Sequence, residues 1–475
     1  MKLAVVVQRY GHGINGGAEL HARYIAEHLA RHADVEVLTT CAADYVTWKN
    51  ELPPGLDRIN GVAIRRFRVA HQRNPLIFGR RSKHVFEERH SIADELSWLD
   101  AEGPASRALI RHIARHGQEY DYIIFFSYRY YHAYHGARAA ASRAVLVPTA
   151  ERDAAIGLSI FTPIFRGVRA LMYNSPEERA VIQAVSDNHS VPSVVVGVGS
   201  EVPLNPQPAR FRQKHDIQGP FAVYVGRIDE NKGCQQLFDF FGSYLLQDAG
   251  HLSLVLIGNS LLPIPNHPRI RHLGFLEDAD KFDAMAAADL LVMPSYFESL
   301  SMVALEAWAL GRPVVANAQC DVLKGQCIRS NAGLYYSNQA EFIGTLRAIE
   351  QHRWISGALG RNGRQFFRDH YEWPIIERKY LDMLERLSRD TTTHTMEPMP
   401  GWWSRRPQNC LPGEEVLAST PSGPSLSIER TEPVRSEPSR VRAPQPAPPD
   451  RPRPPVHDRR RPYHRRGGSS RPRSA

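Results

Sequence analysis

The stretch at residues 221–233 reads FAVYVGRIDENKG and carries the clearest structural pattern of this chain. Its five apolar residues predict a buried strand, and a helical run from Cys234 to Gln247 follows the polar turn. Arg227 and Lys232 therefore stand between the carboxyl end of a strand and the start of a helix, where backbone N–H groups and the helix dipole favour an anion. The stretch predicts a diphosphate-binding loop, although a solvated turn with two surface cations explains it equally well on its own.

The same strand and helix alternation extends in both directions, which is typical of parallel sheets covered by helices. A first series has a helix at 17–31 and strands at 3–7, 35–39, 62–67, 122–126, 144–147 and 171–173. A second series has helices at 281–288 and 299–310 and strands at 221–225, 252–257, 290–293 and 313–316. We expect an α/β protein with two doubly wound Rossmann-like domains that face a cleft, with ligands at the carboxyl ends of the strands.

The division of the chain follows from these series. We expect an N-terminal Rossmann-like domain over residues 1–200, a C-terminal Rossmann-like domain over 201–372 and a helix over 373–390. The tail, 391–475, holds 17 of the 35 prolines and 15 arginines. Such a composition buries too little apolar surface to offset the entropy of ordering, so it predicts disorder.

A second motif lies at residues 297–313, FESLSMVALEAWALGRP. Glu306 is the only charged residue between Glu298 and Arg312, so it sits on a largely buried helix and needs hydrogen-bond donors such as a ribose diol. The helix start at Ser299, Leu300 and Ser301 offers N–H groups to phosphate oxygens, and Glu298 can accept from a sugar hydroxyl. Two alternatives stay open: Glu298 as a first-turn acid, and Glu306 as a carboxylate satisfied by its own protein.

The G-R-x4-K-G segment, the Glu298-x7-Glu306 spacing and the loop at Gly16 and Gly17 together resemble retaining glycosyltransferase family 4. The resemblance spans about residues 1–388. It implies a GT-B fold and a retaining transfer of a sugar from a UDP-, GDP- or similar nucleotide-diphosphate sugar to an acceptor hydroxyl. The product class would be a glycan, polysaccharide or glycolipid. No cofactor is expected beyond the donor substrate.

By matching position, the resemblance implies that Arg227 and Lys232 bind the donor diphosphate. It further implies that Glu306 binds the ribose and Glu298 the transferred sugar. The other positions expected to line the donor site are Gly16, Gly17, Gly226, Gly258, Phe275 and Leu276. The resemblance also implies that residues 1–200 form the acceptor-side domain and residues 201–372 the nucleotide-sugar-binding domain. The helix at 373–387 would cross back onto the first domain.

One departure from the family concerns the end of an N-domain strand, where members commonly carry a histidine. This chain reads PTAERD at 148–153. Either Glu151 or Asp153 takes over a polar role beside the sugar, or the contact is dispensable. The nearest histidines, His132 and His135, are expected to be surface or loop residues.

No metal site is expected. Asp278-Ala279-Asp280 resembles a D-x-D metal clamp, but it precedes the helix at 281–288, where aspartates act as N-caps and first-turn acids. The five cysteines form no C-x-x-C pair, which argues against structural zinc and a disulfide framework. A G-x-G-x-x-G match at 11–16 lacks the acid that a dinucleotide enzyme needs at the end of its second strand.

Net charge and hydropathy limit the kinds of partner and the compartment that we expect for this protein. The tail carries 15 arginines and 8 acids, so it holds 7 of the 9 net positive charges, and the nearly neutral body gives no case for nucleic acid. No segment approaches 18 apolar residues, so a cytoplasmic protein is expected, with peripheral contact to the inner face of the membrane through the basic tail as an option. Alternatives are a nucleotide-sugar epimerase or phosphorylase of the same fold, or a non-catalytic scaffold.

Overall fold

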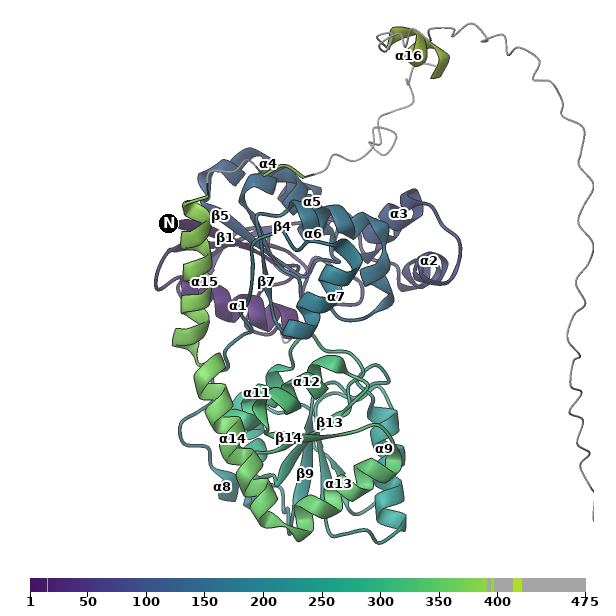
Figure 1. The fold of residues 1–475 in the computed structure, drawn as a ribbon, viewed down its shortest axis with the longest axis vertical. Helices are drawn as coiled ribbons and strands as arrows, with labels where there is room; N and C mark the ends of the chain where they lie inside the picture. The colour runs from purple at the N-terminus through teal and green to yellow at the C-terminus, as the bar shows by residue number, and fades with distance from the viewer. Residues whose placement is uncertain (15, 391–393, 397–412, 421–475) are drawn as a thin grey trace, which may run out of the picture. The chain divides into compact units, whose positions relative to one another are not determined.

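The computed structural model describes residues 1–14, 16–390, 394–396 and 413–420. It contains two β-sheets, one from each half of the chain, and helices pack beside each sheet (Figure 1). All paired strands within them are parallel except β3 and β4. The structure thus confirms the predicted pair of parallel α/β sheets, whereas the boundaries at residues 200 and 372 stay predictions.

The N-terminal sheet has the strand order β3-β4-β2-β1-β5-β6-β7-β8. Its strands are β1 (Lys2–Val6), β2 (Asp34–Thr40), β3 (Gly55–Ile59), β4 (Val62–Phe67), β5 (Tyr122–Phe126), β6 (Ala144–Val147), β7 (Ala170–Tyr173) and β8 (Ser193–Val195). Its α-helices are α1 (Gly17–Leu29), α2 (Pro75–Glu87), α3 (Ile92–Glu102), α4 (Arg107–His116), α5 (Tyr131–Ala139), α6 (Thr162–Gly167) and α7 (Pro176–Ser186). Short 3₁₀ turns lie at Gly117–Glu119, Ala141–Arg143, Ala154–Gly157 and Ser159–Phe161.

The C-terminal sheet has the order β11-β10-β9-β12-β13-β14. Its strands are β9 (Phe221–Val225), β10 (Ser253–Ile257), β11 (Ile270–His272), β12 (Leu290–Met293), β13 (Val314–Asn317) and β14 (Gly333–Tyr336). The helices of this half are α8 (Pro208–Lys214), α9 (Cys234–Leu246), α10 (Asp278–Ala287), α11 (Met302–Ala309), α12 (Asp321–Ser330), α13 (Gln339–Gln351), α14 (Arg353–Tyr371) and α15 (Trp373–Ser388).

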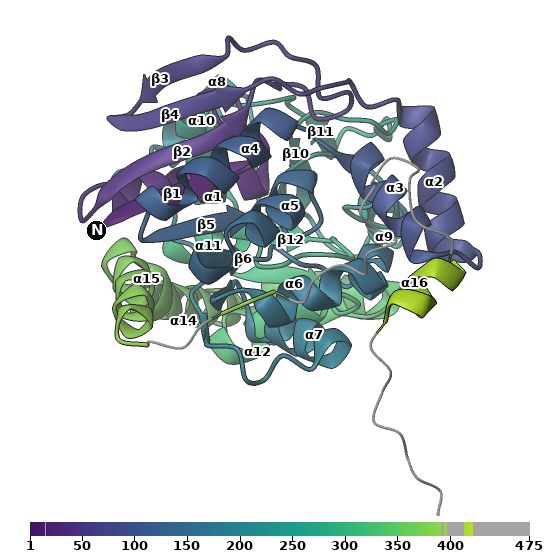
Figure 2. The same ribbon diagram turned by 90° about the horizontal axis from the view of Figure 1, so that it is seen from above.

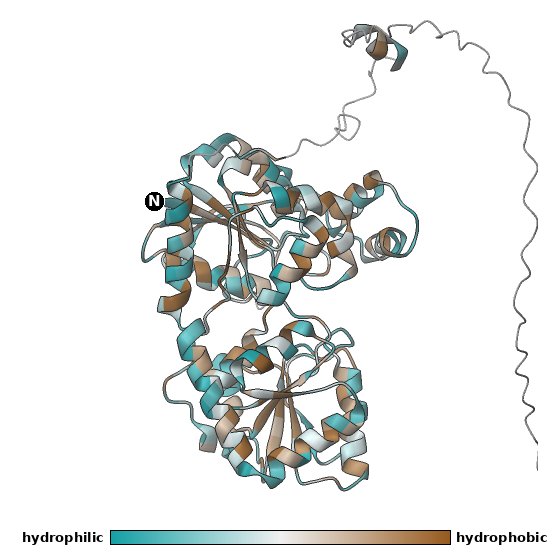
Figure 3. Cartoon of the chain, in the orientation of Figure 1, coloured by the Kyte–Doolittle hydropathy of each residue, from teal (hydrophilic) through white to brown (hydrophobic). Residues whose placement is uncertain are grey.

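The central strands β5, β6, β7, β9 and β12 are apolar and buried because helices cover both faces of each sheet, whereas the edge strand β3 is largely exposed. In β1, Leu3 and Val5 pack in the cluster that contains α1, whereas Ala4 and Val6 pack with α4 and α5. This alternation follows from the two-residue period of a strand. Figure 3 shows the result as apolar strands inside each sheet and polar colour on the outer helices.

Helix α15 lies beside α1, at the edge opposite to α2 and α3 (Figures 1 and 2). The Trp373 ring stacks on His28 with 3.5 Å between ring centroids. Glu377 forms hydrogen bonds with His28 Nδ1 at 2.6 Å and His32 Nε2 at 2.8 Å. The end of the chain's α/β region is thereby attached to the helix that follows the Gly16 and Gly17 loop.

One sequence expectation needs correction in the fold. His132 is fully buried on α5, and its Nε2 contacts Phe126 O at 3.0 Å, so it is no surface residue. Most of the tail that is predicted to be disordered lies outside the described residues, which within it comprise 394–396 and 413–420, including helix α16 (Gly413–Ser419).

No helix in the described part of the chain is long and apolar enough to cross a membrane. The four cysteines that fall within those residues, Cys41, Cys234, Cys320 and Cys327, are buried and free.

Candidate active site

The loop after β9 is organised by Asp229. One of its carboxylate oxygens accepts from Lys232 N at 2.8 Å, and the other accepts from Arg227 Nε. Asp229 therefore holds the Arg227 side chain and the backbone of Lys232 in one turn. Sequence reasoning missed Asp229, although its position between the two cations was a usable signal.

Close backbone contact explains two glycines of this region. A Cβ atom on Gly258 would lie 2.0 Å from Gly226 O, so a side chain cannot be accommodated there. Gly226 and Gly258 both have positive φ, 150° and 133°. Gly258 N donates a hydrogen bond to Gly274 O at 2.7 Å. Phe275 and the partly buried Leu276 follow Gly274 in the chain, so they lie close to Gly258. The Phe275 side chain is 52% exposed and offers an open aromatic face.

Lys232 forms an ion pair with Glu298, with 2.8 Å between Nζ and Oε1. Burial disfavours the ammonium, but the carboxylates of Glu298 and Glu151 outweigh this effect and raise the pKa of Lys232. The ammonium is thus charged at neutral pH. The Lys232 side chain is 32% exposed and that of Arg227 is 51% exposed, so both can be reached by an anionic ligand.

Helix α11 starts three residues later than predicted. Ser301 is the N-cap, with a left-handed φ of 73°, and its hydroxyl accepts from Ala304 N at 3.4 Å. Ser299, Leu300 and Ser301 therefore precede the helix, because the left-handed residue cannot be part of it. Leu300 is buried, and Ser299 Oγ accepts from Asn174 Nδ2 of the N-terminal half at 3.5 Å.

Glu306 on α11 is only 3% exposed. Its Oε1 accepts from Lys281 Nζ at 3.3 Å, whereas its Oε2 is buried without a hydrogen-bond partner. Burial raises the pKa of Glu306, and Lys281 opposes that shift. Burial, followed by the charge of Glu306, also raises the pKa of Tyr24, so this acid interacts electrostatically with a residue of α1. One oxygen of Glu306 is satisfied by the protein, and the other still lacks a donor.

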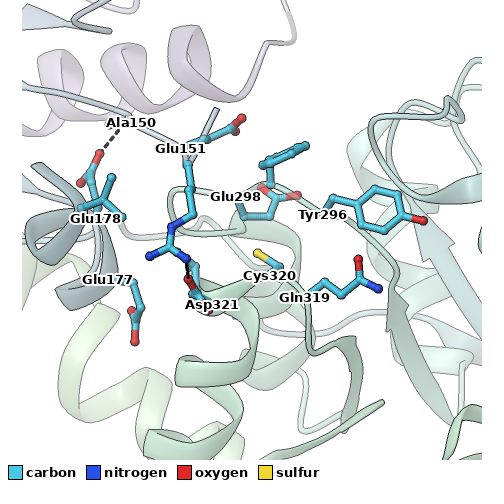
Figure 4. A pocket seen from close by; sticks show the side chains of 13 residues that line it. Ala150, Glu151, Glu177, Glu178, Tyr296, Glu298, Gln319, Cys320 and Asp321 are labelled. Atoms are coloured by element: carbon cyan, nitrogen blue, oxygen red, sulfur yellow. Dashed lines mark hydrogen bonds and ion pairs between the residues drawn. The ribbon is translucent and has the colours of Figure 1, made fainter. Parts of the chain in front are cut away.

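The N-terminal half contributes Glu151, which follows β6 and lines a pocket with Glu298 (Figure 4). Burial, the charge of Glu298 and the other carboxylate, Asp153, raise the pKa of Glu151 to about 7 despite the opposing charge of Lys232. Asp153 is engaged elsewhere, because it accepts from Arg129 Nη1 at 2.6 Å and from Ile156 N at 3.2 Å. Of the two acids left open by the sequence, Glu151 is the one in the pocket.

Glu178 on α7 fixes the base of the Glu151 loop. Its carboxylate accepts from Ala150 N at 2.6 Å and from Asn174 N. Burial raises the pKa of Glu178 to about 8, while these backbone donors lower it. Sequence reasoning missed this acid because nothing in the PEER segment distinguishes it from a first-turn glutamate.

The Gly16 and Gly17 loop begins α1, with Gly16 as the N-cap. A Cβ atom on Gly16 would meet Glu19 Oε2 at 2.0 Å, while one on Gly17 would meet open space. Glu19 pairs with Arg9 at 2.6 Å. A side chain at Gly16 would therefore have to displace the Glu19 carboxylate, whereas one at Gly17 would displace nothing.

The D-x-D sequence pairs with cations of the protein. Asp278 Oδ1 lies 3.0 Å from Lys281 Nζ, and Asp280 Oδ2 lies 2.5 Å from Lys214 Nζ. The N-cap of α10 is Glu277, without a side-chain capping bond, so the expected N-cap role was wrong and the first-turn role is right. Within the described ranges, no group of three or more His, Cys, Asp and Glu side chains could hold a metal ion.

Comparison with known proteins connects this geometry to a family. Residues 219–349 match the family model described as glycosyl transferases group 1. Mannosylfructose-phosphate synthase of Agrobacterium fabrum is 27% identical over 192 residues, which make up 37% of this chain and 42% of that protein. D-inositol 3-phosphate glycosyltransferase of Frankia alni is 30% identical over 227 residues, 42% of this chain and 55% of that protein. The chain spans about half the length of these curated relatives.

Solved structures extend the likeness to both sheets. Sucrose-phosphate synthase from Thermosynechococcus elongatus has a TM-score of 0.60 at 17% identity, covering 82% of this chain and 99% of that one. HepE from Anabaena in complex with UDP has a TM-score of 0.59 at 16% identity, covering 81% and 100%. The fold is therefore GT-B, and residues 219–349 of its C-terminal half match the glycosyl transferases group 1 model.

Proposed function

We propose that this chain is a retaining glycosyltransferase of family 4 that moves a sugar from a UDP- or GDP-sugar to an acceptor hydroxyl without a metal ion. The observation that carries the proposal is the cation pair after β9. The Arg227 side chain is held by Asp229, the Lys232 ammonium is held by Glu298, and both cations are partly exposed. They belong to the segment that matches glycosyl transferases group 1. The fold neighbour HepE is in complex with UDP, which supports a nucleotide donor of this kind.

The chemistry requires charge stabilisation where the sugar leaves the diphosphate. Negative charge grows on the leaving oxygen, and preorganised cations in a site with little water stabilise it most. Lys232 and Arg227 supply that charge in our proposal. Glu298, paired with Lys232, accepts from a sugar hydroxyl and keeps the ammonium oriented.

Glu306 would bind the ribose. Its Oε2 has no donor among the residues that the structure describes, and a buried carboxylate oxygen without one is costly. A ribose hydroxyl removes that cost without displacing Lys281 from Oε1. Because Oε2 is buried here, ribose binding requires a small opening beside α1.

Metal independence is part of the proposal because Asp278 and Asp280 are each paired with a lysine of the protein. The electrostatic role falls to Arg227 and Lys232 instead. The acceptor belongs to the N-terminal half by analogy with other GT-B folds, and its identity is open.

The test is nucleoside diphosphate release by purified protein across UDP-, GDP- and ADP-sugars, with a panel of small-molecule and lipid-linked acceptors. A matched pair of variants gives the control: Lys232→Ala against Lys83→Ala, the latter an exposed lysine on α2. We expect wild type to release nucleoside diphosphate from donors of one nucleotide class. Lys232→Ala should lose this release, and Lys83→Ala should keep it. NMR of the product then reads the anomeric configuration. Absence of release and of binding for every donor would refute the proposal.

A further inference from the structure

Glu151 differs from the other acids of its pocket because it has no hydrogen bond or ion pair within the described ranges of the chain. The pocket is lined by five acids, Glu151, Glu177, Glu178, Glu298 and Asp321. Figure 4 shows Glu151 and Glu298 on the same side of this pocket, with Glu177 and Glu178 on the other. Glu151 comes from the N-terminal half and Glu298 from the C-terminal half.

The cations around the pocket are already committed. Arg152 Nη1 lies 3.1 Å from Asp321 Oδ2, and Arg329 Nη2 donates to Glu177 Oε2 at 3.0 Å. Lys232 is paired with Glu298 at 2.8 Å. The charge of Glu151 therefore has no cation of its own, and the site beside Lys232 is negative whenever Glu151 is ionised.

We propose that Glu151 determines the charge specificity for the transferred sugar, so that the site accepts neutral or amino sugars and rejects sugars that carry a carboxylate. This inference rests on the proposed function, because it assumes that a nucleotide sugar reaches the Lys232–Glu298 pair. The physical reason is that hydroxyl and ammonium groups donate hydrogen bonds to a carboxylate, whereas a uronate adds a third negative charge to a poorly solvated site. Like charges brought together in this way strongly disfavour the wrong ligand.

The specificity should depend on pH. Burial and Glu298 raise the pKa of Glu151 to about 7, so Glu151 is largely neutral at pH 6 and ionised at pH 8.5. Rejection of a uronate, which stays ionised throughout, should thus strengthen as pH rises. The other groups that act on Glu151 are Glu298, Lys232, Asp153, Arg129 and Glu178.

Among these, Glu178 also titrates in this range, since burial raises its pKa to about 8. Its carboxylate is held by the backbone amides of Ala150 and Asn174 behind the loop. A Glu151→Gln variant keeps Glu178 in place. Any pH-dependent discrimination lost in that variant therefore belongs to Glu151.

The experiment measures binding of matched donors by calorimetry: UDP-glucose against UDP-glucuronate, and GDP-mannose against GDP-mannuronate. Each pair shares its nucleotide and diphosphate, so the ratio of dissociation constants reports only the sugar carboxylate. Wild type, Glu151→Gln and the control Glu230→Gln are compared at pH 6 and 8.5. Glu230 is an exposed acid on the β9 loop that does not line the pocket, so its replacement removes the same formal charge.

We expect the uronate to bind about tenfold or more weakly than the neutral sugar in wild type at pH 8.5, since like-charge contacts cost several kcal/mol before screening. The ratio should shrink at pH 6 and fall to within about threefold in Glu151→Gln at both pH values. Glu230→Gln should match wild type. Equal binding of both sugars by wild type, or an unchanged ratio in Glu151→Gln, would overturn the inference and leave the proposed function standing. Binding of none of the four donors would overturn both.

Discussion

Replacing Lys232 with alanine removes the cation that we place beside the leaving diphosphate. The Nζ to Oε1 distance to Glu298 is 2.8 Å, and two unit charges at this distance attract by about 6 kcal/mol at an effective dielectric constant of about 20. If about half a charge develops on a phosphate oxygen at similar range, Lys232 stabilises the transition state by about 3 kcal/mol. The variant should therefore lose about a hundredfold in kcat.

The variant should still fold. Lys232 lowers the pKa of Glu151, so its loss raises that pKa further and lets Glu151 bind a proton at neutral pH. Glu151 and Glu298 together then carry one negative charge instead of two. The lost pair is partly exposed, and such pairs contribute about 1 kcal/mol or less to stability.

The assay is steady-state release of nucleoside diphosphate from the donor identified by the panel, with kcat and KM determined separately. Lys83→Ala controls for the loss of a lysine, and Lys232→Arg tests whether a cation of different shape restores part of the rate. Circular dichroism must show each variant folded. If Lys232→Ala keeps a kcat/KM close to that of wild type, the loop after β9 is a surface turn and the diphosphate site is wrong.

Three further predictions concern the same reaction. Glu306→Gln should raise the donor KM by about tenfold with a smaller change in kcat, because a ribose contact remote from the reacting carbon sets binding; a dominant loss in kcat would argue against the ribose role. Activity should survive EDTA, whereas loss with EDTA and recovery with Mn²⁺ would make Asp278 and Asp280 metal ligands. A chain ending at Met396 should keep the donor KM in a detergent-free assay, and a large rise would give the segment 397–475 a part in donor binding.

The C-terminal half could be predicted closely from the sequence because its signals are contiguous. The strand at 221–225 and the helix that follows it lie where the pattern placed them. The start of α11 could not be predicted, since hydrophobicity alone does not reveal that Ser301 adopts a left-handed φ. Asp229 was missed for a similar reason: its role depends on two hydrogen bonds within a turn.

The N-terminal half was predicted less completely. Helices α2, α3 and α4 fall between Phe67 and Tyr122, a range for which the pattern gave no elements. Helix α2 buries only Val85, so it lacks the apolar stripe by which a surface helix is recognised. His132 was misjudged because a buried histidine needs a specific acceptor, here the carbonyl of Phe126, and that partner is visible only in three dimensions.

Glu151 shows why the two halves must be considered together. A C-terminal half alone would keep Asp229, Lys232 and Glu298, and with them the ion pair at 2.8 Å. It would lack Glu151, whose charge also raises the pKa of Lys232. Glu151 without Glu298 would in turn lose part of the interaction that raises its own pKa to about 7. The three groups set one another's charge, although they come from two sheets. The sequence specifies the type and position of each residue. The protonation state of Glu151 at neutral pH, however, depends on the proximity of the loops after β6 and β12 in the folded protein.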